Sequence, residues 1–288
     1  MNLATKMDLL GLLICAISAF IPVTSYGVYE DKNIILSTNE KATLCGTRFK
    51  NGDLVKYDPA AQTTTLFFSE SRFSHNEDID AACVLPNGNI VLSTTLTAKL
   101  GGLRFRDGDL AEYNPTTNKA TLFFSESRFS CNEDIDVADI LANGNIVLST
   151  KHSAKLGGLR FRDGDLVEYN PNTDKATLFF SESLFSNNED IDAVDVFPDG
   201  SIVLSTKGQA MLGGLRFGKN DLVRYFPYNS FAGDPLAGKA TLYLSGGYFT
   251  SGSTNIDAVS VVSEAPEPAS AFLIGAGLLF VRLRRKKS

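Results

Sequence analysis

The sequence of 288 residues has no tryptophan, only two histidines and only four cysteines. His75 and His152 fall at different places in the repeat described below, so neither belongs to a repeated metal site. Cys15 lies within an N-terminal apolar run. The other cysteines stand at unmatched positions: Cys45, Cys83 and Cys131. An odd number at unmatched positions is not a disulfide framework. One incidental bridge is compatible with it, but stability has to come mainly from packing.

Common catalytic motifs are also lacking, since the chain has no G-x-S-x-G elbow, no H-E-x-x-H pair and no P-loop. The formal net charge is -6, and five basic residues crowd into the last seven positions. The rest of the chain is therefore more acidic still and repels nucleic acid phosphates. These absences predict a protein that is not an enzyme and does not bind nucleic acid.

A repeat of 56 residues is the dominant feature of the chain. The string "NIVLST", or a close variant, starts at Asn33, Asn89, Asn145 and Ser201, each start 56 residues after the last. Residues 89–144 and 145–200 are identical at 42 of 56 positions. Self-similarity at a fixed period is typical of solenoids and propellers.

Each copy contains the pattern of four short strands. "IDAVDVFPDG" followed by "SIVLST" predicts a tight hairpin, and "DLVEYNP" followed by "KATLFFSES" predicts a second one. A Gly-containing link, "AKLGGLRFRDG", joins the two hairpins. One four-stranded sheet cannot bury both of its faces, so the copies should stack, either in a closed ring or in an open array.

The two ends of the repeated region favour the ring. The region begins with a second strand at 33–38 and ends with one extra first strand at 256–262, "IDAVSVV". Pairing these two would complete the first sheet, whereas an open array would expose apolar faces and unpaired edges. We therefore predict an all-β fold, a four-bladed β-propeller closed by its C-terminal strand. A dimer sharing a larger ring and a β-solenoid remain alternatives.

The pattern "NGNIVLST … GDLVEYNP … ATLFF" resembles the blades of gluconolactonase-like and NHL-type propellers. The resemblance concerns strand rhythm and includes no diagnostic motif. Proteins of those families usually have more blades, so the expected number of four comes from the repeat arithmetic alone.

Three segments follow from this organisation: 1–27, 28–264 and 265–288. The first has the layout of a secretory signal, with Lys6, the apolar run "LLGLLICAISAF" and then Pro22. An uncleaved anchor is the alternative. The last segment, "APEPASAFLIGAGLLFVRLRRKKS", combines a Pro-Glu-Pro motif, a short apolar run that predicts a membrane helix, and a basic end. Positive charge there predicts that the terminus stays on the cytoplasmic side.

This last segment closely resembles the PEP-CTERM sorting signal of Gram-negative and related bacteria. The resemblance implies an exported protein of the cell envelope or extracellular matrix, transiently anchored in the membrane and associated with exopolysaccharide. It also implies recognition by an exosortase at the motif Pro266, Glu267 and Pro268. The basic cluster that would stop the helix is Arg282, Arg284, Arg285, Lys286 and Lys287. An ordinary C-terminal anchor is the alternative.

The string "NEDID" supplies the best candidate site. Its last aspartate recurs once per copy, at Asp80, Asp136, Asp192 and Asp257, although the fourth copy has Thr254 where the others have glutamate. In a propeller these four carboxylates would ring the central channel, where hard oxygen ligands suit calcium. The competing interpretation is structural, because a carboxylate at a strand start often accepts backbone N–H bonds.

Three other sets are weaker candidates. The aspartates of "RDGD" and its variants fit turn chemistry better than calcium: Asp53, Asp107, Asp109, Asp163, Asp165 and Asp221. The arginines of "GGLRF" and "GTRF" could face an acidic polysaccharide, or be solvated or paired with nearby acids: Arg48, Arg104, Arg160 and Arg216. The fourth copy is nine residues longer, and its long loop, with Tyr228 and Phe231, is a candidate binding loop.

Taken together, these patterns predict an exported, non-enzymatic binding or structural protein of the envelope, with exopolysaccharide as the leading partner. The main alternative is a calcium-dependent propeller enzyme of the lactonase or hydrolase type. A purely structural protein that self-associates through its near-identical units is a third hypothesis.

Overall fold

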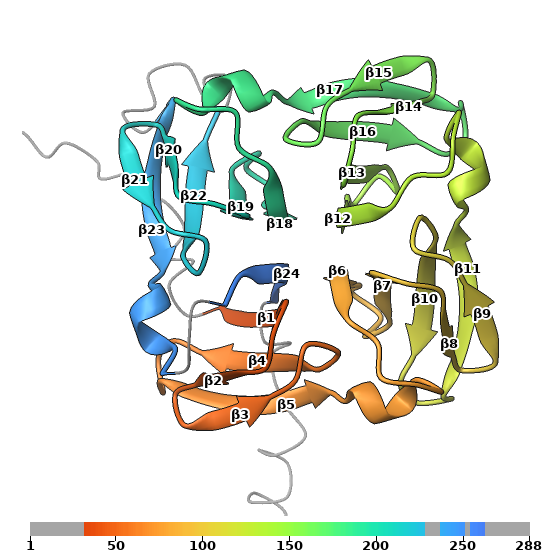
Figure 1. Ribbon diagram of the computed structural model, residues 1–288, viewed down its shortest axis with the longest axis horizontal. Coiled ribbons are helices and arrows are strands. Elements are labelled where there is room, and N and C mark those ends of the chain that lie inside the picture. The colour runs from red at the N-terminus through yellow and green to blue at the C-terminus, as the bar shows by residue number, and fades with distance from the viewer. Residues whose placement is uncertain (1–31, 228–236, 251–253, 263–288) are drawn as a thin grey trace, which may run out of the picture.

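Four antiparallel sheets of four strands each stand around a common centre (Figure 1). The computed structural model describes residues 32–227, 237–250 and 254–262. The predicted all-β, four-bladed propeller is confirmed. From the centre outward, blade 1 is β24 (Ile256–Val262), β1 (Asn33–Thr38), β4 (Leu54–Asp58) and β5 (Thr63–Phe68). Blade 2 is β6 (Ile79–Val84), β7 (Ile90–Thr94), β10 (Leu110–Asn114) and β11 (Lys119–Phe124).

Blades 3 and 4 repeat the same order. Blade 3 is β12 (Ile135–Ile140), β13 (Ile146–Thr150), β16 (Leu166–Asn170) and β17 (Lys175–Phe180). Blade 4 is β18 (Ile191–Val196), β19 (Ile202–Thr206), β22 (Leu222–Phe226) and β23 (Lys239–Leu244). The innermost strand of every blade carries the "ID" pair of the repeat, which places these aspartates at the centre of the ring.

The ring closes as the repeat arithmetic predicts. Strand β24 pairs antiparallel with β1, with Val259 opposite Leu36 and Ser260 opposite Ile35. Ile256 and Val259 are 0% and 2% exposed in the apolar cluster between blades 4 and 1. Both ends of the described chain are thereby held in one sheet, and the inner strands of blades 4 and 1 share one apolar cluster.

Adjacent blades join through the same aromatic contact at three of the four junctions. A phenylalanine at the end of an outer strand meets the edge of a tyrosine in the next blade, with ring centroids 5.6, 5.6 and 5.8 Å apart. The pairs are Phe68–Tyr113, Phe124–Tyr169 and Phe180–Tyr225. Edge-to-face packing of this kind stabilises beyond simple area burial, so the repeat encodes the joint as well as the blade.

The Gly-containing link is itself a hairpin, which the sequence interpretation treated as a connection. The four hairpins are β2 (Ala42–Leu44) with β3 (Thr47–Phe49), β8 (Ala98–Leu100) with β9 (Leu103–Phe105), β14 (Ala154–Leu156) with β15 (Leu159–Phe161), and β20 (Ala210–Leu212) with β21 (Leu215–Phe217). Gly101 and Gly102 have φ of +54° and +89°, as a two-residue hairpin turn of type I′ requires.

Each blade ends in one turn of 3₁₀-helix that leads to the next inner strand. These turns are η1 (Glu70–Arg72), η2 (Glu126–Arg128), η3 (Glu182–Leu184) and η4 (Gly246–Tyr248). A serine caps each one, as Ser69 does by accepting from the N–H of Ser71. The turns occupy the corners of the ring in Figure 1.

Side chains on the inner strands tie neighbouring blades together around the channel. The N–H of Val196 donates to Asp139 Oδ2 at 2.9 Å, and the N–H of Val261 donates to Asp195 Oδ1 at 3.0 Å. The N–H of Val84 donates to Ser260 Oγ at 3.0 Å. Three of the four inner strands are thus bonded to the next strand of the ring, which fixes the width of the channel.

The two terminal segments lie outside the described residues, as do the sorting motif Pro266, Glu267 and Pro268, the basic cluster that follows it, and the loop with Tyr228 and Phe231. Within 32–227, 237–250 and 254–262, no helix has the length and apolar character to cross a membrane. Cys45, Cys83 and Cys131 are free thiols.

Candidate functional site

The four aspartates of the predicted ring meet in one pocket at the centre of the propeller. Asp80, Asp136, Asp192 and Asp257 each follow the first residue of an inner strand, and all are 5% or 6% exposed. The pocket has a volume of about 250 Å³. Its lining residues are Asn39, Asp78, Asp80, Thr95, Asp134, Asp136, Lys151, Asp192, Lys207, Asn255 and Asp257. We call it the channel pocket.

The buried carboxylates of the channel pocket have unused hydrogen-bonding capacity. Within the part of the chain that the structure describes, Oδ1 of Asp80, Asp136 and Asp257 and Oδ2 of Asp192 have no hydrogen-bond partner. The same is true of Oδ1 in Asn255. Native proteins satisfy most buried polar atoms, so purely structural bonding leaves one oxygen of every ring aspartate unexplained.

Burial and mutual repulsion raise the pKa values of these carboxylates. Burial is the main cause throughout, and it raises the pKa of Asp78 and of Asp136 to about 7. The pKa of Asp192 rises to about 6. Burial, with nearby aspartate charge as the next cause, raises the pKa of Asp80 and of Asp257 well above the ordinary value. The pocket therefore holds more carboxyl groups than it can keep ionised at neutral pH.

Two lysines supply the positive charge of the pocket, and they differ in their contacts. Lys207 Nζ lies 2.8 Å from Asp136 Oδ2 and 2.5 Å from Asp190 Oδ2. Burial alone would lower the pKa of Lys207, but these two contacts outweigh it and raise the pKa. Lys151 is more exposed and reaches Asp134 at 3.4 Å. Six aspartates face two lysines in the pocket lining.

The structure brings the predicted calcium ligands into one pocket but does not group them as metal ligands. Asp80, Asp136, Asp192 and Asp257 share one pocket, but among the residues that the structure describes no three His, Cys, Asp or Glu side chains are grouped so as to hold a metal ion. Reasoning from the sequence did not identify Lys207 as a residue of the site. Lys207 stands at the position where blades 1 and 2 have Asn39 and Thr95. Comparison of the residue that follows "ST" in each copy could have found it.

The last aspartate of "RDGD" and of its variants has the turn role that the sequence favoured. Asp109 accepts from the N–H of Arg106 through Oδ2 at 2.9 Å and from the N–H of Glu126 through Oδ1 at 2.8 Å. Equivalent bonds involve Asp53, Asp165 and Asp221. The candidate arginines lie on the outer hairpins with exposed side chains: Arg48, Arg104, Arg160 and Arg216.

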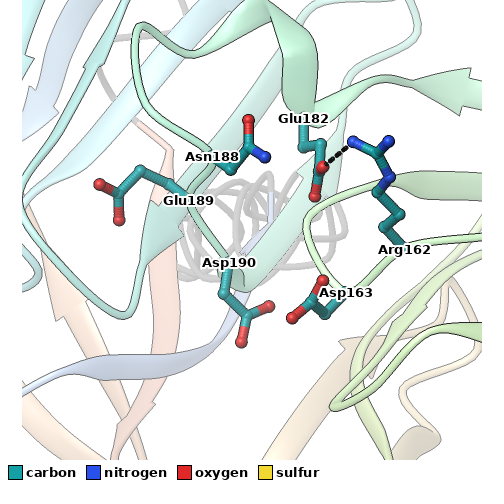
Figure 2. A pocket seen from close by; sticks show the side chains of 6 residues that line it. All are labelled: Arg162, Asp163, Glu182, Asn188, Glu189 and Asp190. Atoms are coloured by element: carbon teal, nitrogen blue, oxygen red, sulfur yellow. Dashed lines mark hydrogen bonds and ion pairs between the residues drawn. The ribbon is translucent and has the colours of Figure 1, made fainter.

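A second pocket, of about 430 Å³, lies beside blade 3 (Figure 2). Arg162 Nη1 lies 2.5 Å from Oε1 of the buried Glu182, and Asp163 and Asp190 point toward each other below this pair. Its lining residues are Arg162, Asp163, Glu182, Asn188, Glu189 and Asp190. Asp190 also contacts Lys207, so this side pocket adjoins the channel pocket through one carboxylate.

The ion pair of the side pocket is part of the repeat, and blade 4 has lost both of its members together. Lys50 and Arg106 pair with Glu70 and Glu126 in the same way, but blade 4 has Gly218 and Gly246. A Cβ on Gly246 would lie 2.3 Å from the side chain of Asn220. Asn220 therefore fills the space that the glutamate occupies elsewhere in the repeat.

The raised pKa values predict that stability falls as the pH rises from about 4 to about 7. In this window the folded protein binds more protons than the unfolded chain, so the free energy of unfolding decreases with pH. Calorimetry between pH 5 and pH 8 should show the melting midpoint falling by at least about 2 °C, a shift of the size that about 1 kcal/mol produces in a domain of this length.

Asp80→Asn should flatten this pH dependence, whereas Glu40→Gln, at an exposed position, should leave it unchanged. A midpoint that rises steadily from pH 5 to pH 8 would contradict the assignment of raised pKa values to the channel pocket.

Comparisons with known proteins concern the fold alone. Neither a protein-family model nor a curated protein sequence matches the chain. Among solved structures, a chain of a nidogen/laminin complex matches with 7% identity over 81% of this chain and 98% of that one, at a TM-score of 0.41. The hemopexin-fold protein CP4 from cow pea matches with 14% identity over 73% and 95%, at a TM-score of 0.40. A proposed gluconolactonase matches with 9% identity over 72% and 62%, at a TM-score of 0.33.

Other matches are longer proteins. The extracellular domain of a proposed one-component system from B. thetaiotaomicron matches with 15% identity and a TM-score of 0.30. The match includes 66% of this chain and 21% of that one. This chain covers 49% of an auxiliary nutrient binding protein from Bacteroides thetaiotaomicron, with 7% identity and a TM-score of 0.34. Likenesses at this level assign no ligand or activity to the propeller.

Proposed function

We propose that the protein is a non-catalytic binding module and that its ligand enters the channel pocket. The observation that carries the proposal is that each buried aspartate of the ring has one oxygen for which the described residues provide no hydrogen-bond partner. Leaving such a group unsatisfied costs about 1–3 kcal/mol. A polar ligand that donates hydrogen bonds into the pocket would offset this cost, and that gain supplies binding energy.

The cellular context of the proposal rests on the two terminal segments. Residues 1–27 would direct export, and Pro266, Glu267 and Pro268 would present the sorting motif to an exosortase. The working location is the cell envelope or extracellular matrix, with exopolysaccharide as the partner. A sugar fits the pocket chemically, because its hydroxyl groups donate hydrogen bonds to carboxylate oxygens.

An enzyme of the lactonase or hydrolase type is the second candidate, and one observation favours it. Asp78 and Asp136 have pKa values of about 7 in a pocket that also contains Lys207. Carboxyl groups with pKa values near the working pH are suited to general acid–base chemistry. The calcium that the sequence analysis attached to this candidate finds no group of three ligands among the described residues, so the enzyme candidate rests on the carboxyl groups and Lys207.

Binding measurements on the full chain in mild detergent separate these proposals. Thermal shift and calorimetric titration would use calcium with and without chelator, monosaccharides, amino sugars and exopolysaccharide. A ligand of the channel pocket should lose at least tenfold in affinity in Asp257→Asn, and should bind normally to Glu189→Gln in the side pocket. Binding that is unchanged in Asp257→Asn would contradict the assignment, and turnover of lactones would favour the second candidate.

A further inference from the structure

The most informative feature of the channel pocket is its departure from fourfold symmetry. One residue per blade follows the second strand: Asn39, Thr95, Lys151 and Lys207. The backbone holds three of them identically, since the N–H groups of Thr95, Lys151 and Lys207 donate at 3.0 Å to the carbonyls of Asp78, Asp134 and Asp190. For Asn39 the bond goes to the carbonyl of Asn255 at 3.2 Å. All four side chains line the pocket.

Lys207 shows what this position binds when it is filled. Its ammonium group lies between Asp190 of its own blade and Asp136 on the inner strand of the preceding blade. Both carboxylates use Oδ2 for this contact. These two carboxylates thus bind an ammonium group, and in blade 4 this group belongs to the protein's own Lys207.

The same site in blade 2 lacks the ammonium group. Here the residue at the lysine position is Thr95, the carboxylate of its own blade is Asp78, and that of the preceding inner strand is Asp257. Asp257 is 5% exposed, and among the described residues Oδ1 of neither aspartate has a hydrogen-bond partner. The carboxylate of Asp78 also makes a hydrogen bond with the side chain of Asn51. Both aspartates line the channel pocket, and the charge of Asp78 is one cause of the raised pKa of Asp257, after burial.

At the two remaining positions, those of Lys151 and Asn39, the negative charge is balanced or reduced in other ways. In blade 3, Lys151 supplies an ammonium group at 3.4 Å from Asp134. In blade 1, Asn255 replaces the carboxylate of the residue's own blade, and its backbone N–H donates to Asn39 Oδ1 at 2.9 Å. The side chain of Asn255 also bonds to Asp192 and lowers its pKa against the effect of burial. Within the described residues, the Thr95 position alone combines two carboxylates with no cation at the lysine position.

We propose that the Thr95 position binds the primary ammonium group of a small amino sugar, held between Asp78 and Asp257 as Lys207 Nζ is held between Asp190 and Asp136. The ring hydroxyls would donate to the remaining free oxygens of Asp80 and Asn255. A volume of about 250 Å³ is below the range of drug-sized pockets and suits a single sugar ring. This inference rests on the proposed binding function and specifies the ligand of the same site.

Calorimetric titration of the full chain with glucosamine and with glucose tests the inference, because the two sugars differ in one ammonium group. Glucosamine should bind at least tenfold more tightly than glucose. Thr95→Lys should weaken glucosamine binding at least tenfold by supplying a tethered ammonium group, and should keep or raise the melting midpoint. Asp257→Asn should weaken glucosamine binding to a similar extent, whereas Thr95→Ser should bind like the native protein.

Equal affinity for glucosamine and glucose, or native affinity in Thr95→Lys, would overturn the inference. Binding of calcium or of neutral sugars in the channel pocket without glucosamine binding would overturn it too, but would leave the proposed binding function standing. If no sugar or calcium binding depends on Asp257, both proposals are wrong.

Discussion

Replacing Ile256 and Val259 together by aspartate should remove most of the stability of the propeller. Each substitution gives up about 1.5–3 kcal/mol of apolar burial and places a carboxylate where 0% or 2% of the native side chain is exposed. Burying an unpaired charge adds a further cost, so the total should exceed about 5 kcal/mol, which is comparable with the whole stability of many domains. Calorimetry and light scattering should show an early or absent transition and aggregates.

The matched control is Leu178→Asp with Leu242→Asp, because these leucines lie on outer strands and are 53% and 52% exposed. Each should change the free energy of unfolding by no more than about 0.5 kcal/mol. If the Ile256/Val259 variant melted cooperatively at the native midpoint as a monomer, strand β24 would not be closing the ring.

Lys207→Met should cause the second largest loss. It leaves Asp136 and Asp190 facing each other without their shared ammonium group. Breaking a fully buried ion pair costs about 3–5 kcal/mol. Because a third of the Lys207 side chain is exposed and solvent weakens the interaction, we expect about 2 kcal/mol at pH 8. The loss should shrink at pH 5, where Asp136, with its pKa of about 7, is protonated.

Lys151→Met is the natural control for this variant, since Lys151 holds the same place in blade 3 but is more exposed and lies 3.4 Å from its partner. It should cost less than about 1 kcal/mol. Equal losses in the two variants by chemical denaturation, or a Lys207→Met loss that does not depend on pH, would contradict the account of the channel charges.

The architecture could be predicted because the sequence repeats the same unit four times. The 56-residue period, with one strand displaced to the C-terminal end, identifies the pairing of Asn33–Thr38 with Ile256–Val262. The additional hairpins were missed because their strands have only three residues and their turns depend on positive φ at Gly101 and Gly102 and at equivalent positions. Such short strands give too little alternation to distinguish them from a link.

The repeat also made one part of the candidate site predictable, the ring of aspartates, but not the residues that differ between blades. The ring of Asp80, Asp136, Asp192 and Asp257 recurs with the repeat, so the period places it at the channel. The unequal residues carry the specificity proposed for the pocket, and a search for repetition passes over them. Lys207 and Thr95 gain their meaning only when the closed ring sets each one against the carboxylate of the preceding blade.

A carboxyl-carbon NMR titration of ¹³C-aspartate-labelled protein tests the central claim most directly, which is that the closed ring buries more carboxylates than its lysines can neutralise. The resonance that disappears in Asp78→Asn should titrate with a pKa of about 7, well above the ordinary aspartate value of about 3.9. It should move to lower pH when glucosamine is added. If that resonance, and those lost in Asp80→Asn and Asp257→Asn, all titrated below about pH 4.5, the pocket would be solvated like an open surface and the account would be wrong.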